Sequence, residues 1–182
     1  MGLVIDLTEK KYDMMAREAF GSLARRFGCE ITGQTCLKDL NDSFISFFLP
    51  ISPTIFHILS RSASKIIFFR HEGKVNLDED QEKRMMVLNL TLFLADQIRF
   101  EAMYRLRWVL DFPTRHIPIV RLIADFHQKY SNFERFTPAL SPEHPSYHEY
   151  DRVADTSDKA AVVRRLIPDL IKAFQESTPP DR

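Results

Sequence analysis

The sequence predicts an all-α protein, a compact bundle of six to seven helices around a long central helix at about residues 79–111. Three observations support this prediction. Apolar residues recur every three or four positions in several segments, which is the pattern of helices with one buried face. Capping residues and prolines stand where these segments begin. The composition, 45% hydrophobic with 15 phenylalanines, is ample for one core, so residues 1–182 are expected to form a single helical domain.

Three helices are predicted before the central one. Helical spacing of apolar residues runs through residues 8–27, and Gly28 is suited to end that helix. A short helix is expected within residues 36–49, where a following proline stops it. Ser52 and Pro53 then make a favourable helix start, because the hydroxyl can cap the first turn and the proline lacks a donor where none is needed.

The end of the third helix is ambiguous in the sequence. Residues 66–77 contain β-branched and aromatic residues around Gly73, and they would also form a small β-hairpin. The acidic run at residues 78–80 suits the start of the central helix. Nearly every residue in 85–95 is apolar, so that part is expected to be enclosed by other helices, and it is too short to cross a bilayer.

Prolines divide the C-terminal half of the chain. A helix with an apolar face is expected over residues 118–130, starting at a proline. Three prolines within residues 131–146 predict an extended crossing over the surface, the best candidate for a lid. A short helix at 147–154 and a last helix from about Ser157, kinked at Pro168, complete the bundle.

Charge and cysteine content indicate the environment of the protein. The 25 basic and 25 acidic side chains balance, so no net charge draws the chain to nucleic acid or an anionic membrane. Two cysteines, Cys29 and Cys36, are typical of a reducing compartment, and their spacing fits no common zinc motif. The N-terminus lacks the pattern of a secretory signal. We therefore expect a cytoplasmic protein without a membrane or nucleic-acid partner, and the sequence names no cofactor.

Two histidines have a spacing that could bind a metal. His144 and His148 are four residues apart, so on a helix they could face one ion with Asp151 nearby. Pro145 lies between them and fits only the first turn of a helix, and no second ligand pair follows at a telling distance. Ordinary surface histidines in a proline-rich segment are the alternative explanation.

Polar residues interrupt the apolar part of the predicted central helix. Asn89, Asp96, Arg99 and Glu101 would be costly to bury without partners. One explanation is that they pair along the helix, Asp96 with Arg99 three residues on and Glu101 with Arg105 four residues on. The other is a pocket inside the bundle, where these four groups orient a mostly apolar ligand.

The function predicted from these observations is a non-enzymatic binding or regulatory module that recognises a protein partner or a small apolar ligand. No nucleophile elbow, zinc-protease pair or Gly-rich phosphate loop occurs in the sequence. Apolar residues exceed what one stripe per helix needs, so we expect a homo-oligomer, with a homodimer as the working hypothesis. The competing hypothesis is a metal-dependent enzyme that uses His144, His148 and Asp151.

Overall fold

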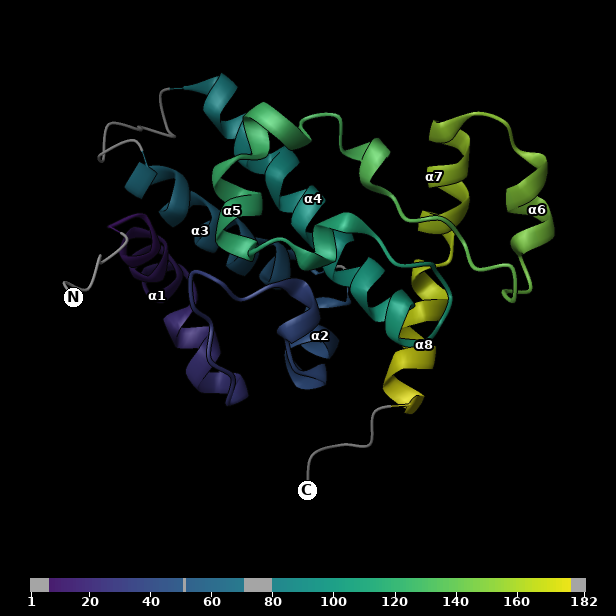
Figure 1. Ribbon diagram of the computed structural model, residues 1–182, viewed down its shortest axis with the longest axis horizontal. Helices are drawn as coiled ribbons and strands as arrows, with labels where there is room; N and C mark the ends of the chain where they lie inside the picture. The colour runs from purple at the N-terminus through teal and green to yellow at the C-terminus, as the bar shows by residue number, and fades with distance from the viewer. Residues whose placement is uncertain (1–6, 51, 71–79, 178–182) are drawn as a thin grey trace, which may run out of the picture.

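The computed structural model describes residues 7–50, 52–70 and 80–177, and helices dominate this part of the chain (Figure 1). No strand forms in these ranges, and β-type pairing there is limited to two isolated bridges. The all-α prediction is therefore confirmed. The α-helices of the described ranges are α1 (Leu7–Phe27), α2 (Asp42–Phe48), α3 (Pro53–Arg70), α4 (Gln81–Arg105), α5 (Ile119–Ala124), α6 (Tyr147–Arg152), α7 (Thr156–Arg165) and α8 (Ile167–Ser177).

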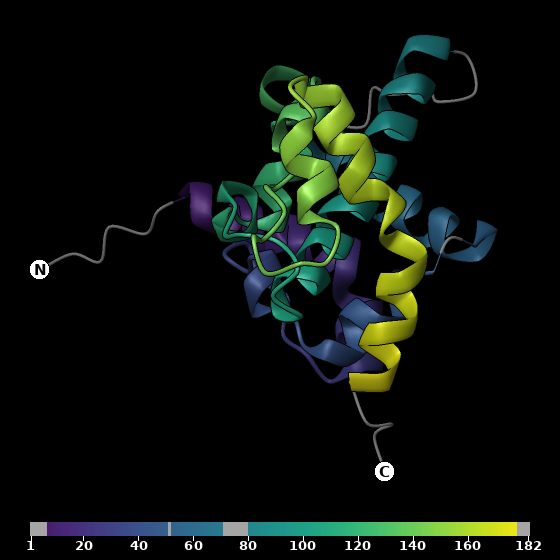
Figure 2. The ribbon, with the colours of Figure 1, turned by 90° about the vertical axis from the view of Figure 1, so that its right-hand side faces the viewer.

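Helix α4 is the central element, as the sequence predicts. It packs against α3, α2 and α8, and α1 covers the other side of α3. Fully buried side chains on α4 include Leu90, Phe93 and Phe100. The expectation that all of residues 85–95 are enclosed is wrong, however, because the first turns of α4 extend beyond the helices that cover its second half (Figure 2).

Helix α4 begins where the acidic run predicts and ends earlier than residue 111. Asp80 caps its start, since its Oδ1 atom accepts a hydrogen bond from the Lys83 amide at 3.1 Å. The helix stops at Arg105 because Arg107 adopts a left-handed conformation with a φ of 62°. The Trp108 amide then donates to the Met103 carbonyl at 2.8 Å, which closes a Schellman motif. Glycine is the usual residue at this position, so an arginine gives no stop signal in the sequence.

Helix α3 begins where the sequence predicts and remains helical to its last residue, Arg70. The Ile55 amide donates to the Ser52 hydroxyl at 3.2 Å, and Pro53 occupies the first position, as predicted. Residues 66–70 belong to this helix, so the first strand of the alternative β-hairpin does not form. The remainder of the hairpin prediction, residues 71–77, lies outside the described residues.

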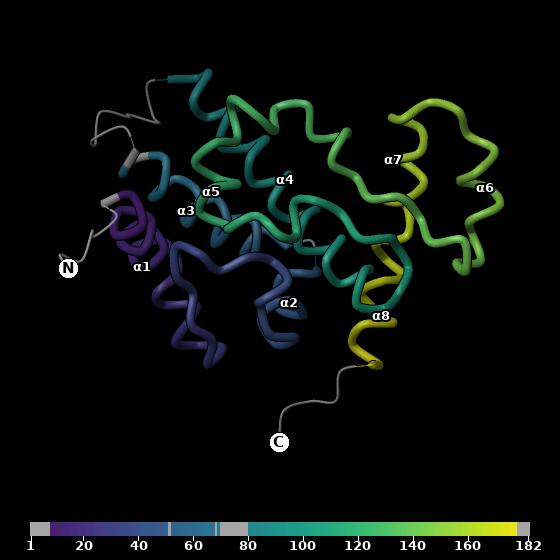
Figure 3. Tube along the Cα trace, in the orientation of Figure 1, coloured from purple at the N-terminus to yellow at the C-terminus, as the bar shows by residue number. Residues whose placement is uncertain are grey.

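The segment at residues 131–146 differs from the predicted surface lid. Figure 3 traces it from the end of the α5 region toward α6. Leu140 is buried and forms a bridge with Val109, and the Ser141 amide donates to the Trp108 carbonyl at 2.8 Å. Because these bonds hold the chain against the turn after α4, Leu140 and Ser141 are buried and the lid prediction is wrong there.

The C-terminal helix is broken rather than only kinked. Helix α7 ends at Arg165, and α8 starts at Ile167, with Pro168 as its second residue. Proline is tolerated there because the first amides of a helix have no partner within it. This break raises the number of helices in the described ranges to one above the predicted range.

The length and hydropathy of the described helices indicate whether any of them could cross a membrane. No single helix in these ranges is long and apolar enough to span a bilayer. One bent pair, α2 with the Pro53–Ile67 part of α3, reaches the required length and composition. Its residues Phe44, Ile45 and Phe48 are buried in the core of the protein.

Candidate functional site

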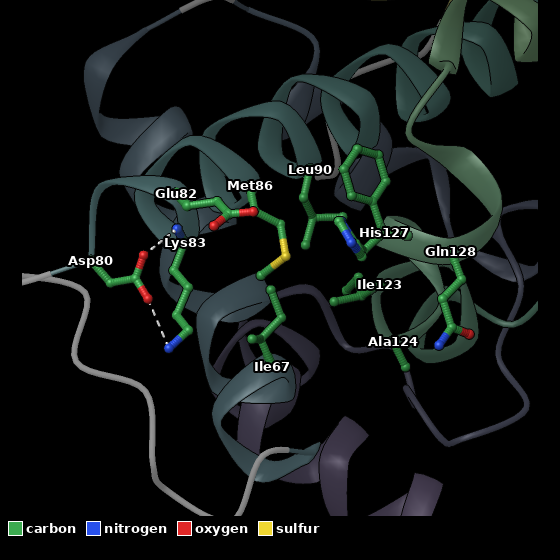
Figure 4. A pocket seen from close by; sticks show the side chains of 11 residues that line it. Ile67, Asp80, Glu82, Lys83, Met86, Leu90, Ile123, Ala124, His127 and Gln128 are labelled. Atoms are coloured by element: carbon green, nitrogen blue, oxygen red, sulfur yellow. Dashed lines mark hydrogen bonds and ion pairs between the residues drawn. The ribbon is translucent and has the colours of Figure 1, made fainter.

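A pocket of about 320 Å³ lies between the end of α3, the start of α4 and the turn that follows α5. Its volume is within the range of about 300–1,000 Å³ that small-molecule sites occupy. Three separate stretches of sequence form its wall (Figure 4). The lining residues are Ile67, Asp80, Glu82, Lys83, Met86, Leu90, Ile123, Ala124, Phe126, His127 and Gln128.

The inner wall of the pocket is apolar. Ile67, Leu90 and Ile123 are buried and come from α3, α4 and α5 respectively. Figure 4 shows that their side chains and that of Met86 point toward one another. Phe126, which is also buried, completes this wall. A ligand that enters would therefore remove apolar surface from water, which stabilises a complex by about 25 cal/mol per Å² before the costs of binding.

The rim of the pocket is polar. Asp80 and Lys83 form an ion pair with 2.8 Å between Oδ2 and Nζ. The hydrogen bonds from Lys83 hold the pKa of the Asp80 carboxyl below its usual value. Glu82, His127 and Gln128 are exposed at the rim. The site thus places carboxylate, imidazole and amide groups beside an apolar wall.

A π-helical turn at Phe126–Tyr130 shapes one side of the rim. Such turns are rare and occur often at functional sites. The first and last residues of the turn are aromatic, and both rings pack against Phe93 with centroid distances of 5.3 and 5.6 Å. His127, between them, remains exposed at the pocket. The turn therefore anchors its ends in the core and presents its middle to a ligand.

The polar residues predicted to form a ligand pocket on α4 have different surroundings in the structure. Asn89 is exposed to solvent. Asp96 pairs with Arg99 at 3.5 Å and with Arg164 of α7 at 2.7 Å. The Nε atom of Arg99 also donates to the Leu49 carbonyl at 3.1 Å, and burial lowers the pKa of this guanidinium. Asp96 and Arg99 thus connect α4 to the helices packed on it.

Glu101 belongs to a second network of ion pairs. Its carboxylate accepts hydrogen bonds from the Nε atoms of Arg105 at 3.0 Å and Arg115 at 2.9 Å. The Arg115 guanidinium also lies over the Tyr104 ring, 3.7 Å from its centroid. The pair of Glu101 with Arg105 is confirmed, as is the pair of Asp96 with Arg99. None of the four predicted ligand-binding residues lines the pocket at the start of α4.

The predicted metal ligands lie in and just before α6. The His144 ring packs against Trp108 with 5.0 Å between centroids, and its Nδ1 atom accepts a hydrogen bond from the Ser146 amide at 3.1 Å. His148 and Asp151 are exposed. In the part of the chain that the structure describes, no three His, Cys, Asp or Glu side chains gather in a way that could hold a metal ion. The metal-dependent enzyme stays a prediction without a ligand cluster to support it.

Sequence reasoning missed most of the pocket for a specific reason. Met86, Leu90 and Ile123 have the spacing of ordinary core residues, and the shared pocket arises only when two helices bring them together. The one local signal was the acidic run, which correctly marked Asp80 as a helix start. Nothing in a short window of sequence distinguishes a residue that lines a cavity from one that fills the core.

Comparisons with known proteins assign no family to this chain. No protein-family model matches it, and neither does any curated protein or solved structure. The geometry of the site is therefore the basis on which a function can be inferred.

Proposed function

We propose that this protein is a non-enzymatic helical module that binds a small, mostly apolar ligand in the pocket between α3, α4 and α5. The observation that carries the proposal is the apolar wall beside a polar rim, with Met86 and Leu90 next to Glu82 and His127 (Figure 4). Small-molecule sites have this composition because apolar surface supplies affinity while a few polar groups orient the ligand.

The volume of the pocket limits the size of the ligand. About 320 Å³ is the space of roughly ten water molecules, since each occupies about 30 Å³ in the liquid. A compact molecule with a similar number of non-hydrogen atoms fits that space. Met86, which is only partly buried, has a flexible thioether side chain that can adjust to different apolar shapes.

The proposal places this binding module in the cytoplasm. Cys29 and Cys36 are both free thiols. Free thiols in a folded protein are typical of a reducing compartment, where disulfides rarely persist. We infer a regulatory role in which the ligand stabilises the folded state by mass action.

Octanol is a suitable first probe of the pocket, and its binding is measured by ligand-observed NMR. Ala124 lines the pocket and is partly buried, so the Ala124→Phe variant should fill the site with a phenyl ring. Ala161→Phe is the matched control, because Ala161 is exposed on α7 and does not line the pocket. Circular dichroism verifies that both variants fold.

Octanol is expected to bind the wild-type protein and the Ala161→Phe control. It is not expected to bind the Ala124→Phe variant. Absence of binding to the wild-type protein would contradict the proposal. Equal binding to both folded variants would also contradict it, because octanol would then occupy another part of the surface. Native mass spectrometry of freshly purified protein complements the test, since a retained ligand appears as surplus mass.

A second candidate function is homodimerisation through the exposed face of α4. Met85, Leu88 and Leu92 are 48%, 37% and 43% exposed and follow one another at helical spacing. The polar residues Arg84 and Asn89 flank this apolar stripe. In a dimer whose twofold axis passes through Leu88 perpendicular to the helix, α4 packs antiparallel on its copy, so the stripe meets itself and apolar groups contact apolar groups.

Size-exclusion chromatography with light scattering tests the dimer. Leu88→Glu places a charge in the middle of the stripe and is expected to give a monomer. Met14→Glu is the control, because Met14 is 51% exposed on α1, outside the stripe. A wild-type protein that stays monomeric over the whole concentration range excludes this candidate, as does a Leu88→Glu variant that still dimerises.

A further inference from the structure

We propose that the ligand of the α3–α4–α5 pocket is a small amphipathic amine, whose apolar part enters the pocket and whose protonated amino group binds at the rim. This inference rests on the proposed ligand-binding function and specifies the chemical class of the ligand. It follows from which charged groups at the rim already have partners within the protein and which do not.

The ion pair of Asp80 with Lys83 neutralises two of the three formal charges that the described rim residues carry. Lys83 Nζ lies 2.8 Å from Asp80 Oδ2, and the Lys83 amide donates to Oδ1 of the same carboxylate. Glu82 carries the third charge. Among the described residues, no basic side chain forms an ion pair with Glu82, which is exposed at the rim. The described lining residues therefore include one acid, Glu82, whose charge is not compensated by an ion pair.

The start of α4 would otherwise be expected to attract an anion. Exposed amides and the positive end of the helix dipole favour negative groups at a helix N-terminus. Here the protein supplies that negative group, because the Asp80 carboxylate caps the helix and accepts a hydrogen bond from the Lys83 amide at 3.1 Å. The Arg84 amide donates to the Asp80 carbonyl at 3.0 Å. These donors are therefore not available to a ligand carboxylate or phosphate.

The rim offers hydrogen-bond acceptors that match an ammonium group. An ammonium has three donors and no acceptor. The Glu82 carboxylate and the side-chain carbonyl of Gln128 are both acceptors on the rim. Figure 4 shows Glu82 and His127 on opposite sides of Met86. An amine held by Glu82 would thus stand above the apolar wall, with its hydrocarbon part directed toward Leu90.

The chemical class is tested with three probes that share one hydrocarbon chain. Octylamine, octanol and octanoate are titrated into the full-length protein by isothermal calorimetry. The inference expects octylamine to bind more tightly than octanol, and octanoate to bind more weakly than either. Because a charge pair at an exposed rim is screened by water, Glu82→Gln is expected to weaken octylamine binding by about three- to fivefold. Octanol carries no charge and reports whether the pocket is intact, so its affinity should fall less than that of octylamine in this variant.

Glu176→Gln is the matched control, since Glu176 is an exposed acid on α8 that does not line the pocket, and it should leave the affinity for octylamine unaltered. Equal affinity for all three probes, preference for octanoate, or an unchanged octylamine affinity in Glu82→Gln overturns the amine assignment while octanol binding still supports the pocket. Failure of all three probes to bind the wild-type protein instead removes the proposed function itself.

Discussion

The Nε atom of Arg115 lies 2.9 Å from Oε2 of Glu101, a carboxylate whose side chain is only 1% exposed. Arg105 donates to the other oxygen of the same carboxylate at 3.0 Å. One buried acid therefore holds two cations, one from its own helix and one from the segment that leads to α5. Because α5 precedes the turn that forms part of the pocket rim, this network also helps to position the candidate site.

Removal of the charge on Glu101 is expected to destabilise the protein. Glu101→Gln leaves Arg105 and Arg115 without their shared buried anion, and loss of one partner from a buried pair costs about 3 kcal/mol. Urea unfolding measures the change in the free energy of unfolding. The control Glu176→Gln, at an exposed position on α8, is expected to change it by less than about 0.5 kcal/mol. Similar values for the two variants would contradict the stabilising role of the network.

Two glycines are expected to respond in opposite ways to alanine. A Cβ atom on Gly33 would lie 2.7 Å from the backbone of Tyr12, so Gly33→Ala must displace main chain and should destabilise the protein by about 2 kcal/mol. Gly21 lies inside α1, and a Cβ atom there meets nothing within 4 Å. Gly21→Ala should therefore stabilise the protein by about 1 kcal/mol, through helix propensity. Thermal unfolding of both variants checks the signs, and a neutral Gly33→Ala would refute the close approach to α1.

Arg107 is the one described residue other than glycine with a positive φ, at 62°. Glycine adopts this conformation without steric cost, so Arg107→Gly is expected to stabilise the protein by about 0.5–1 kcal/mol. Arg84→Gly, in the exposed helical part of α4, should destabilise it by about 1 kcal/mol. Chemical denaturation of both variants tests the end of α4. Destabilisation by Arg107→Gly would show that helix α4 continues through this residue.

His144 is expected to make the stability of the protein depend on pH. Burial against Trp108 lowers the pKa of His144, and the charge of Asp169 only partly opposes this effect. The folded state therefore binds the proton less readily than the unfolded chain, whose histidine has a pKa of about 6.5. Stability contributed by the neutral ring is present above this value and is lost as the pH falls through it toward the folded pKa.

The measurement is the melting temperature between neutral and mildly acidic pH. On acidification, the melting temperature of the wild-type protein should fall further than that of His144→Gln, which has no titrating ring at this position. His148→Gln is the control, because His148 is exposed on α6. Parallel pH profiles for the wild-type protein and His144→Gln would contradict the prediction.

Local sequence signals correctly identified several helix boundaries and ion pairs. The cap at Asp80 and the start at Ser52 depend on a side chain that bonds to an amide three residues away. The pair of Asp96 with Arg99 depends on helical spacing alone. Because the two partners of each interaction lie close together in the sequence, they can be recognised without knowledge of the fold. The same locality left two explanations open for the polar residues of α4, because helical spacing does not show which neighbouring elements they meet.

The sequence by itself determined the all-α class and the order of the helices, because helical periodicity and capping act within a few residues. Tertiary structure decided the rest. Arg115 reaches Glu101 across 14 residues, and the Ser141 amide bonds to the Trp108 carbonyl, which holds the buried Leu140 and Ser141 against the turn after α4. The pocket likewise combines residues of α3, α4 and α5, whose apolar side chains have the same local pattern whether they fill a core or line a cavity. Only the packing of one helix against another distinguishes these two outcomes.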